Sequence, residues 1–157
     1  MSKNENTISH NPLASLPLTG KLLGLDLGSK TIGIAISDGM RYSATPLLTI
    51  KRSKFKNDAQ SLIEIIDDNN IVGLVLGLPL NMDGSEGPRV QSSKAFARNL
   101  SAVISLPIAF WDERLSTSAV TKTLIEADIS RAKRAQVVDK LAASYILQGA
   151  LDRLRNN

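Results

Sequence analysis

The chain has 157 residues, no cysteine and a formal net charge of +4, and 43% of its residues are apolar. These values are typical of one globular domain and exclude a disulfide framework and a thiolate metal site, so oxygen atoms or the single His10 would have to bind any metal. The basic balance favours phosphate-bearing partners without requiring them.

The first 20 residues are predicted to be a mobile N-terminal extension, and residues 21–157 to be the folded domain. The extension is polar and is interrupted by Pro12 and Pro17, so it lacks the apolar stretch of a signal peptide. No apolar run approaches the roughly 18 residues of a membrane span. We expect a cytoplasmic protein without a membrane partner.

Apolar periodicity predicts strands that alternate with helices after an initial strand meander. The predicted strands cover residues 22–27, 31–37, 43–50, 71–78 and 107–111. The predicted helices cover residues 58–68, 90–104, 117–127 and 131–154. A glycine turn joins the first two strands as an antiparallel pair, and the uninterrupted apolar run at 71–78 is typical of a strand buried on both faces. This order predicts an α/β fold, one mixed sheet with parallel strands beside the meander and helices on its faces.

Acidic residues occur in three separate elements. Asp26 lies in the middle of the first strand, where an ionised carboxylate is costly unless it is paired or binds a metal. Asp112 and Glu113 lie at the end of the fifth strand and point to opposite faces if the strand continues that far, so only one of them can meet Asp26. Asp139 shares a helix face with the small apolar residues Ala142 and Ala143 and is therefore predicted to point inward.

Carboxylates gathered from strand ends and a facing helix suit Mg²⁺ or Mn²⁺, which prefer oxygen ligands. Two such ions can activate water and stabilise the leaving oxygen of a phosphodiester. Each acid alone is more often a cap, a turn residue or half of an ion pair. Gly28 to Gly33 has the spacing of a Walker loop but lacks the lysine and hydroxyl residue that must follow. The phosphate-binding hairpin of actin- and hexokinase-like kinases is a closer alternative, although those enzymes need two such domains.

Basic residues cluster at 51–56, "KRSKFK", and at 131–134, "RAKR". Arg131, Lys133 and Arg134 lie on the helix of Asp139, so a phosphate backbone drawn by them would come close to the acids. The glycine-rich loop 81–89 could close over that backbone with Arg89 as a phosphate contact. The alternatives are a solvated surface for the basic clusters and a plain connection for the loop.

Four motifs together resemble one known family. They are "LLGLDLGSKTIGIAISD" (22–38), "GLVLGLPLNMDGSEGPR" (73–89), "WDERLST" (111–117) and "VVDKLAAS" (137–144). In this order they resemble the YqgF/RuvX family, whose members are described as pre-16S rRNA nucleases or Holliday junction resolvases. The resemblance implies a ribonuclease H-like fold, a five-stranded mixed sheet flanked by helices, with a divalent metal at the end of the first strand. It places the three acids of the family at Asp26, Glu113 and Asp139, with Asp112 as the fallback for the middle position.

The expected function is therefore a metal-dependent nuclease, a hydrolase in which Asp26, Glu113 and Asp139 hold one or two Mg²⁺ or Mn²⁺ ions. The expected contacts to the nucleic-acid backbone are Lys30, Arg89, Arg114, Arg131, Lys133 and Arg134. The family name points to processing of the 5′ end of pre-16S rRNA in ribosome biogenesis. The first alternative is resolution of four-way DNA, which needs two symmetric cuts and hence a homodimer. The others are a non-catalytic RNA-binding factor and an isolated nucleotide-binding module.

Overall fold

The computed structural model describes residues 13–115 and 131–156, and over residues 131–139 it describes the helix without its side chains. One sheet has the strand order β3-β2-β1-β4-β5. Its strands are β1 Lys21–Leu27, β2 Thr31–Ser37, β3 Ala44–Lys51, β4 Ile71–Leu78 and β5 Ile108–Asp112. The first three form an antiparallel meander, and β4 and β5 run parallel to β1. The expected five-stranded mixed sheet is confirmed.

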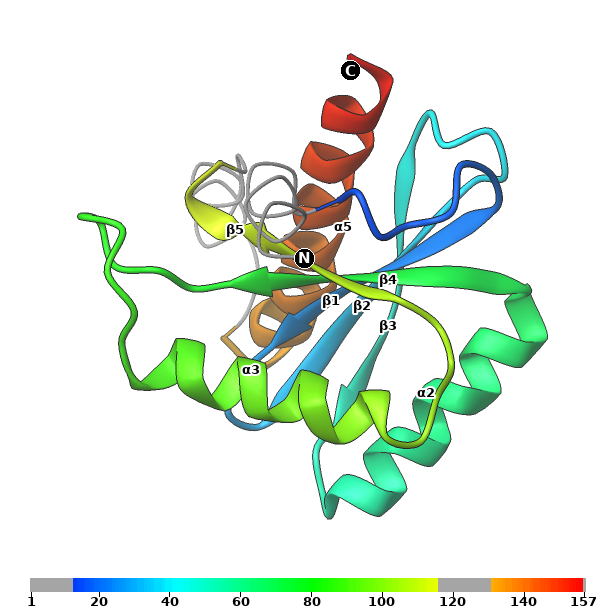
Figure 1. Cartoon of the computed structure of the whole chain (residues 1–157). Coiled ribbons are helices and arrows are strands. Elements are labelled where there is room, and N and C mark those ends of the chain that lie inside the picture. Colours follow the sequence, from blue (N-terminus) through cyan, green and yellow to red (C-terminus); the bar gives the residue numbers. More distant parts are fainter. Residues whose placement is uncertain (1–12, 116–130, 157) are drawn as a thin grey trace.

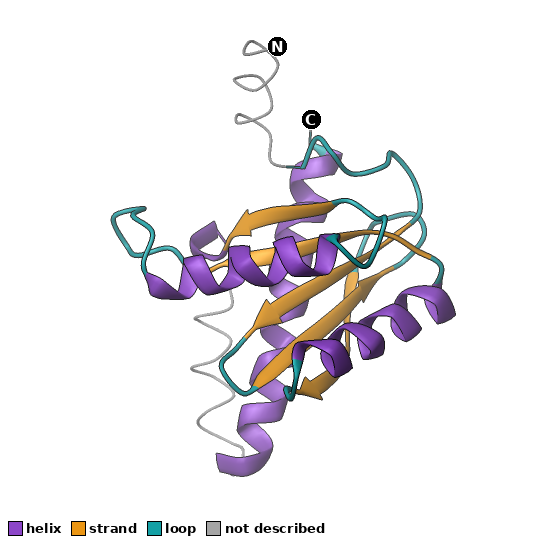
Figure 2. Ribbon diagram, turned by 60° about the horizontal axis from the view of Figure 1, so that its bottom comes forward, coloured by secondary structure: helices purple, strands orange, loops and turns teal. Residues whose placement is uncertain are grey.

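Helices cover both faces of this sheet (Figure 1). Helices α2 Phe55–Asn69 and α3 Pro88–Ser101 lie on one face, and the long helix α5 Arg131–Arg155 crosses the other, as the turned view of Figure 2 also shows. A single 3-10 turn, η1 Glu113–Leu115, follows β5. The helix predicted at residues 117–127 lies outside the described residues. None of the described helices is long and apolar enough to cross a membrane.

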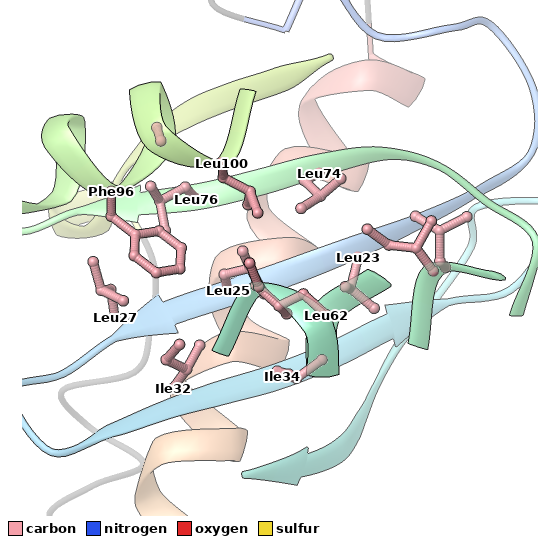
Figure 3. Close-up of a cluster of buried hydrophobic side chains, with 14 residues drawn as sticks. Leu23, Leu25, Leu27, Ile32, Ile34, Leu62, Leu74, Leu76, Phe96 and Leu100 are labelled. Carbon is pink, nitrogen blue, oxygen red and sulfur yellow. The ribbon is translucent and has the colours of Figure 1, made fainter. Parts of the chain in front are cut away.

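Alternation along β1 divides its side chains between two cores. Leu23, Leu25 and Leu27 are buried beneath α2 and α3, where they meet Leu62 and Phe96 (Figure 3). The intervening residues of β1 therefore face α5, and among them Leu22 belongs to the second apolar cluster. The predicted alternation is thus confirmed, and it places Asp26 on the face that α5 covers.

Helix α5 lies very close to the sheet at Gly24. A Cβ atom on Gly24 would lie 2.7 Å from Cβ of Leu147 and 3.0 Å from the carbonyl oxygen of Ala143, so only glycine fits there. Further along the helix, the Gln148 side chain accepts a hydrogen bond from the backbone N–H of Ala44 at the start of β3, 2.9 Å away. Because β3 starts where β1 starts, α5 runs from the carboxyl end of β1 toward its amino end.

Residues 13–20, assigned above to the N-terminal extension, pack on the domain. Leu13 and Leu16 are 1% and 7% exposed and belong to the apolar cluster beneath α5. A turn brings the two leucines to one side, since the N–H of Leu16 donates to the carbonyl oxygen of Leu13. Leu16 also lies so close to Gly73 that a Cβ atom there would be 2.8 Å from its Cδ2 atom. The folded unit therefore includes residues that precede Lys21.

Candidate active site at the carboxyl ends of the parallel strands

Three parallel strands, β1, β4 and β5, end at one edge of the sheet, and acidic residues lie at that edge. The pairing of Leu25 with Leu76 brings the next residues of these strands, Asp26 and Gly77, side by side. Gly77 is in turn paired with Trp111 of β5, just before the two acids that follow it. The topology therefore brings together acids that lie far apart in the sequence.

Asp26 is 9% exposed and faces α5 between two glycines. Its partner in the antiparallel pair with β2 is Gly33, and its neighbour on β4 is Gly77. Neither glycine has a side chain, so neither neighbouring strand places one of its own side chains against the Asp26 carboxylate. The space over Gly77 is taken up by side chains of other elements, Ile146 of α5 and Glu113.

Glu113 folds back over the same surface. A Cβ atom on Gly77 would lie 2.9 Å from Cγ and 3.1 Å from Oε2 of Glu113. Since Gly77 stands next to Asp26 on the α5 face, the carboxylate of Glu113 lies beside the position of Asp26. Strand β5 ends at Asp112 and the chain turns into η1 at Glu113. The alternation of side chains along a strand therefore does not apply to Glu113.

Asp112 points to the opposite face of the sheet, and its carboxylate binds Arg114. Trp111 belongs to the cluster beneath α5, so Asp112 points toward the α3 side of the sheet. Its carboxylate accepts hydrogen bonds from the guanidinium of Arg114, with 2.6 Å between Oδ2 and Nη2 and 3.0 Å from each oxygen to Nε. These bonds hold the pKa of Asp112 below its usual value. The two neighbouring acids that sequence alternation left as alternatives therefore have different surroundings, and Glu113 is the one beside Asp26.

The third predicted acid, Asp139, is placed only through its helix. It precedes Ala143 by one helical turn, and the carbonyl of Ala143 packs on Gly24. The direction of α5 carries Asp139 from that contact toward the carboxyl end of β1, where Asp26 lies. Its side chain is outside the described part of the structure, as are those of Arg131, Lys133 and Arg134. Among the residues whose side chains are described, no group of three His, Asp or Glu suited to a metal ion occurs.

Arg114, which is also predicted to contact nucleic acid, joins two parts of the protein. Besides binding Asp112, it donates from Nη1 to the carbonyl oxygen of Met82 at 3.1 Å, and Asp83 adds to the attraction. It thereby fixes the loop between β4 and α3 to the end of β5. The pattern "WDERLST" gives no sign of this role, because Met82 and Asp83 lie some thirty residues earlier in the chain.

Arg89 and Lys30, two further predicted contacts, lie at the same end of the molecule. Arg89 begins α3 and is exposed at a cavity of about 540 Å³ that is also lined by Glu113, Arg114 and the loop from Pro79. Lys30 is exposed in the turn between β1 and β2. Gly77 is not among the predicted site residues, and Arg52, which lies near this turn, is predicted only as part of a basic cluster.

Comparisons with known proteins give one family match and highly similar relatives. The family model described as "RuvX: Holliday junction resolvase" matches residues 20–153. A protein of Cereibacter sphaeroides (strain KD131), named "Putative pre-16S rRNA nuclease", is 65% identical over 142 residues, which cover 90% of this chain and 89% of the relative. A protein of the same name from Paracoccus denitrificans is 64% identical over 141 residues, with coverage of 90% and 89%.

Solved structures show the same architecture. The structure described as "T. thermophilus RuvC in complex with Holliday junction substrate" superposes with a TM-score of 0.56 at 12% identity, covering 88% of this chain and 97% of that one. A second Thermus thermophilus RuvC structure gives a TM-score of 0.55, also at 12% identity, covering 87% of this chain and 96% of that one. At such low identity the likeness concerns the fold alone, and it confirms the expected ribonuclease H-like fold.

Proposed function

Because the chain belongs to the RuvX family, we propose that it is a divalent-metal-dependent nuclease whose Asp26 and Glu113 carboxylates hold the metal beside the scissile phosphodiester. The observation that supports this most is the surface around Asp26. A buried carboxylate stands between Gly33 and Gly77, and the carboxylate of Glu113 folds over Gly77. Asp139, from the start of α5, is proposed as the third ligand.

These residues fit a hard divalent cation. Carboxylate oxygens are the ligands that Mg²⁺ and Mn²⁺ prefer, and the glycines on both sides of Asp26 add no side chains of their own that would compete with such an ion for the carboxylate. When bound, such an ion lowers the pKa of water and neutralises negative charge on the phosphate. Asp26, held rigidly within the sheet, fixes where the ion and the phosphate meet. Glu113 lies in a short turn after β5 and would add a ligand from a second element, and Asp139 would add a third from α5.

The substrate proposed first is the precursor of 16S rRNA, cut at its 5′ end during ribosome biogenesis. Relatives with about 64% identity are named "Putative pre-16S rRNA nuclease". The net charge of +4 is suited to an RNA backbone. The second candidate substrate is four-way DNA, because the matching family model is described as a Holliday junction resolvase.

The test is cleavage of a pre-16S rRNA fragment and of four-way junction DNA by wild-type protein and by Asp26→Asn, with Mg²⁺, with Mn²⁺ and with a chelator. We expect Asp26→Asn to lower kcat at least about 100-fold, as removal of one charge-stabilising group from an active site does, and the chelator to stop cleavage by the wild type. Asp68→Asn on the exposed side of α2 is the matched control. An Asp26→Asn protein that cleaves like the wild type under Mg²⁺ would refute the assignment.

The same experiment separates the remaining alternatives. Cleavage of four-way DNA in preference to the rRNA fragment, together with a dimer in sedimentation, would favour a junction resolvase, because paired cuts need two-fold symmetry. Salt-sensitive RNA binding without cleavage under any metal would favour a non-catalytic RNA-binding factor. Thermal stabilisation by ATP would favour a nucleotide-binding module.

A further inference from the structure

A second, strongly basic pocket lies next to the candidate active site, on the other face of the sheet. It has a volume of about 310 Å³ and lies between the turn that joins β1 to β2 and the beginning of α3. The residues that line it are Leu27, Gly28, Ser29, Arg52, Arg89, Ser92 and Ser93. They include two arginines and three serines, and no carboxylate is among them. This composition is suited to an anion.

Arg52 is fixed in this pocket by the protein itself. Its Nη1 atom donates to the carbonyl oxygen of Gly28 at 2.6 Å, and its guanidinium carbon lies 5.7 Å from the ring centroid of Phe96. Its backbone N–H also donates to the carbonyl oxygen of Lys30. A guanidinium that lies over an aromatic ring and is tied to a turn is preorganised to bind a phosphate through its remaining N–H groups.

The two arginines of the pocket have no carboxylate partner among the described residues. The ion pairs that the structure shows join Lys94 to Glu86, Arg114 to Asp112 and Arg155 to Asp152. Arg52 is only partly exposed, so leaving its charge uncompensated costs more than it would for a solvated lysine. A bound anion would provide the missing partner.

Arg89 connects this pocket to the candidate active site. It lines both the basic pocket and the cavity of about 540 Å³ that contains Glu113. On the other side, Leu27 and Gly28 of the pocket directly follow Asp26 along β1. A chain of phosphates that passes the proposed metal ligands therefore reaches the pocket without leaving the surface of the protein.

We propose that Arg52 and Arg89, assisted by the hydroxyls of Ser29 and Ser92, bind a backbone phosphate of the substrate strand next to the phosphate that is cut. The proposal rests on the nuclease function above and adds how the strand is positioned. The strand passes the carboxyl end of β1 and turns around the β1–β2 hairpin, so that one phosphate lies at Asp26 and a neighbouring one lies at Arg52. Contacts of this kind fix position without reading the base sequence.

The test measures binding rather than catalysis, so it does not depend on the metal site. A labelled single-stranded RNA from the pre-16S 5′ region is titrated in the presence of EDTA with wild type, Arg52→Gln and Ser92→Asp. Arg98→Gln and Asn99→Asp, on exposed positions of the same helix α3, make the same charge changes outside the pocket. We expect the two pocket variants to lose about tenfold in affinity, the effect of one charge-assisted hydrogen bond. The two control variants should stay within about twofold of the wild type.

Two further measurements identify the nature of the effect. Arg52→Gln should reduce the slope of log affinity against log salt by about one, since one phosphate contact is lost. In cleavage assays it should raise KM far more than it lowers kcat, the opposite of the pattern expected for Asp26→Asn. The metal-site assignment can therefore fail while the pocket is confirmed, and the reverse can also occur.

Ser92→Asp keeps the experiment decisive if Arg52→Gln weakens the fold. Ser92 is exposed near the beginning of α3, where an added carboxylate is favourable to the helix, and the substitution leaves the bond from Arg52 to Gly28 intact. Affinity losses limited to the pocket variants would support the proposal. Affinities of Arg52→Gln and Ser92→Asp that equal those of their controls would overturn it.

Discussion

Gly77 is the residue at which one added methyl group tests the candidate site most directly. A Cβ atom there would lie 2.6 Å from Cδ1 of Ile146 and 2.9 Å from Cγ of Glu113. Heavy atoms do not approach so closely, so Gly77→Ala must displace a neighbour. Strand β4 itself is held on both sides by β1 and β5, whereas Glu113 lies in a single 3-10 turn. We therefore expect the side chain of Glu113 to move away from Asp26.

Overpacking of this kind costs about 1–3 kcal/mol, whereas domains of this size are stable by about 5–15 kcal/mol. The Gly77→Ala protein should therefore remain folded under assay conditions. Its cleavage rate should nevertheless fall about tenfold or more, because Glu113, the proposed metal ligand, would be displaced by a fraction of an ångström from the position in which it can hold the ion. A loss of activity that exceeds the loss of folded protein separates displacement of Glu113 from simple unfolding.

Denaturant unfolding and cleavage of the rRNA fragment are measured on the same preparations. Gly39→Ala is the control, since a Cβ atom at Gly39 meets no other atom within 4 Å, and its stability should change by less than about 0.5 kcal/mol. If Gly77→Ala has the stability and the kcat of the wild type, the placement of Glu113 over Gly77 is wrong.

Two further predictions concern stability. Hydrogen bonds from Arg114 hold the folded-state pKa of Asp112 below its unfolded value, so this contribution is present above about pH 4 and is lost as the pH falls through the folded pKa. In urea unfolding, the advantage of wild type over Asp112→Asn should therefore shrink on acidification from neutral pH, and a constant difference would contradict this linkage. Leu13→Ala should destabilise the protein by about 2–5 kcal/mol, because Leu13 is 1% exposed. Leu18→Ala, at a residue that is 94% exposed, should leave the unfolding midpoint unchanged, and equal effects of the two would place residues 13–20 outside the folded unit.

Most of the fold could be predicted from the sequence because its strands carry strong local signals. Alternation in β1 and β2, the continuous apolar run of β4 and the asparagines that end α2 each predict an element correctly. In the structure Asn70 adopts the left-handed backbone conformation, with φ of 55°, that ends the helix. The boundary at Lys21 was set by polar composition, and composition does not show that Leu13 and Leu16 pack beneath α5.

The candidate site was less predictable because its decisive features depend on neighbours across the sheet. The alternation of side chains along β5 does not decide which of Asp112 and Glu113 lies beside Asp26. That depends on where β5 ends and on which carboxylate Arg114 binds. Gly77 has no local signal, because its role is to leave space for the side chain of Glu113, which comes from η1. Spacing along β1 therefore identifies Asp26 as an unusual acid. The pairing of β1, β4 and β5 shows that Glu113 is the second acid beside it.

The basic cluster at residues 51–56 shows how the fold separates residues that look equivalent in sequence. It contains four cations, and Lys51, Lys54 and Lys56 are all exposed. Arg52 alone lies over the Phe96 ring and donates a hydrogen bond to Gly28, because the chain turns at the end of β3 and points that one side chain toward the hairpin. A charge run in the sequence therefore predicts attraction to phosphate in general. The structure indicates which of the four cations is fixed at the turn that follows Asp26.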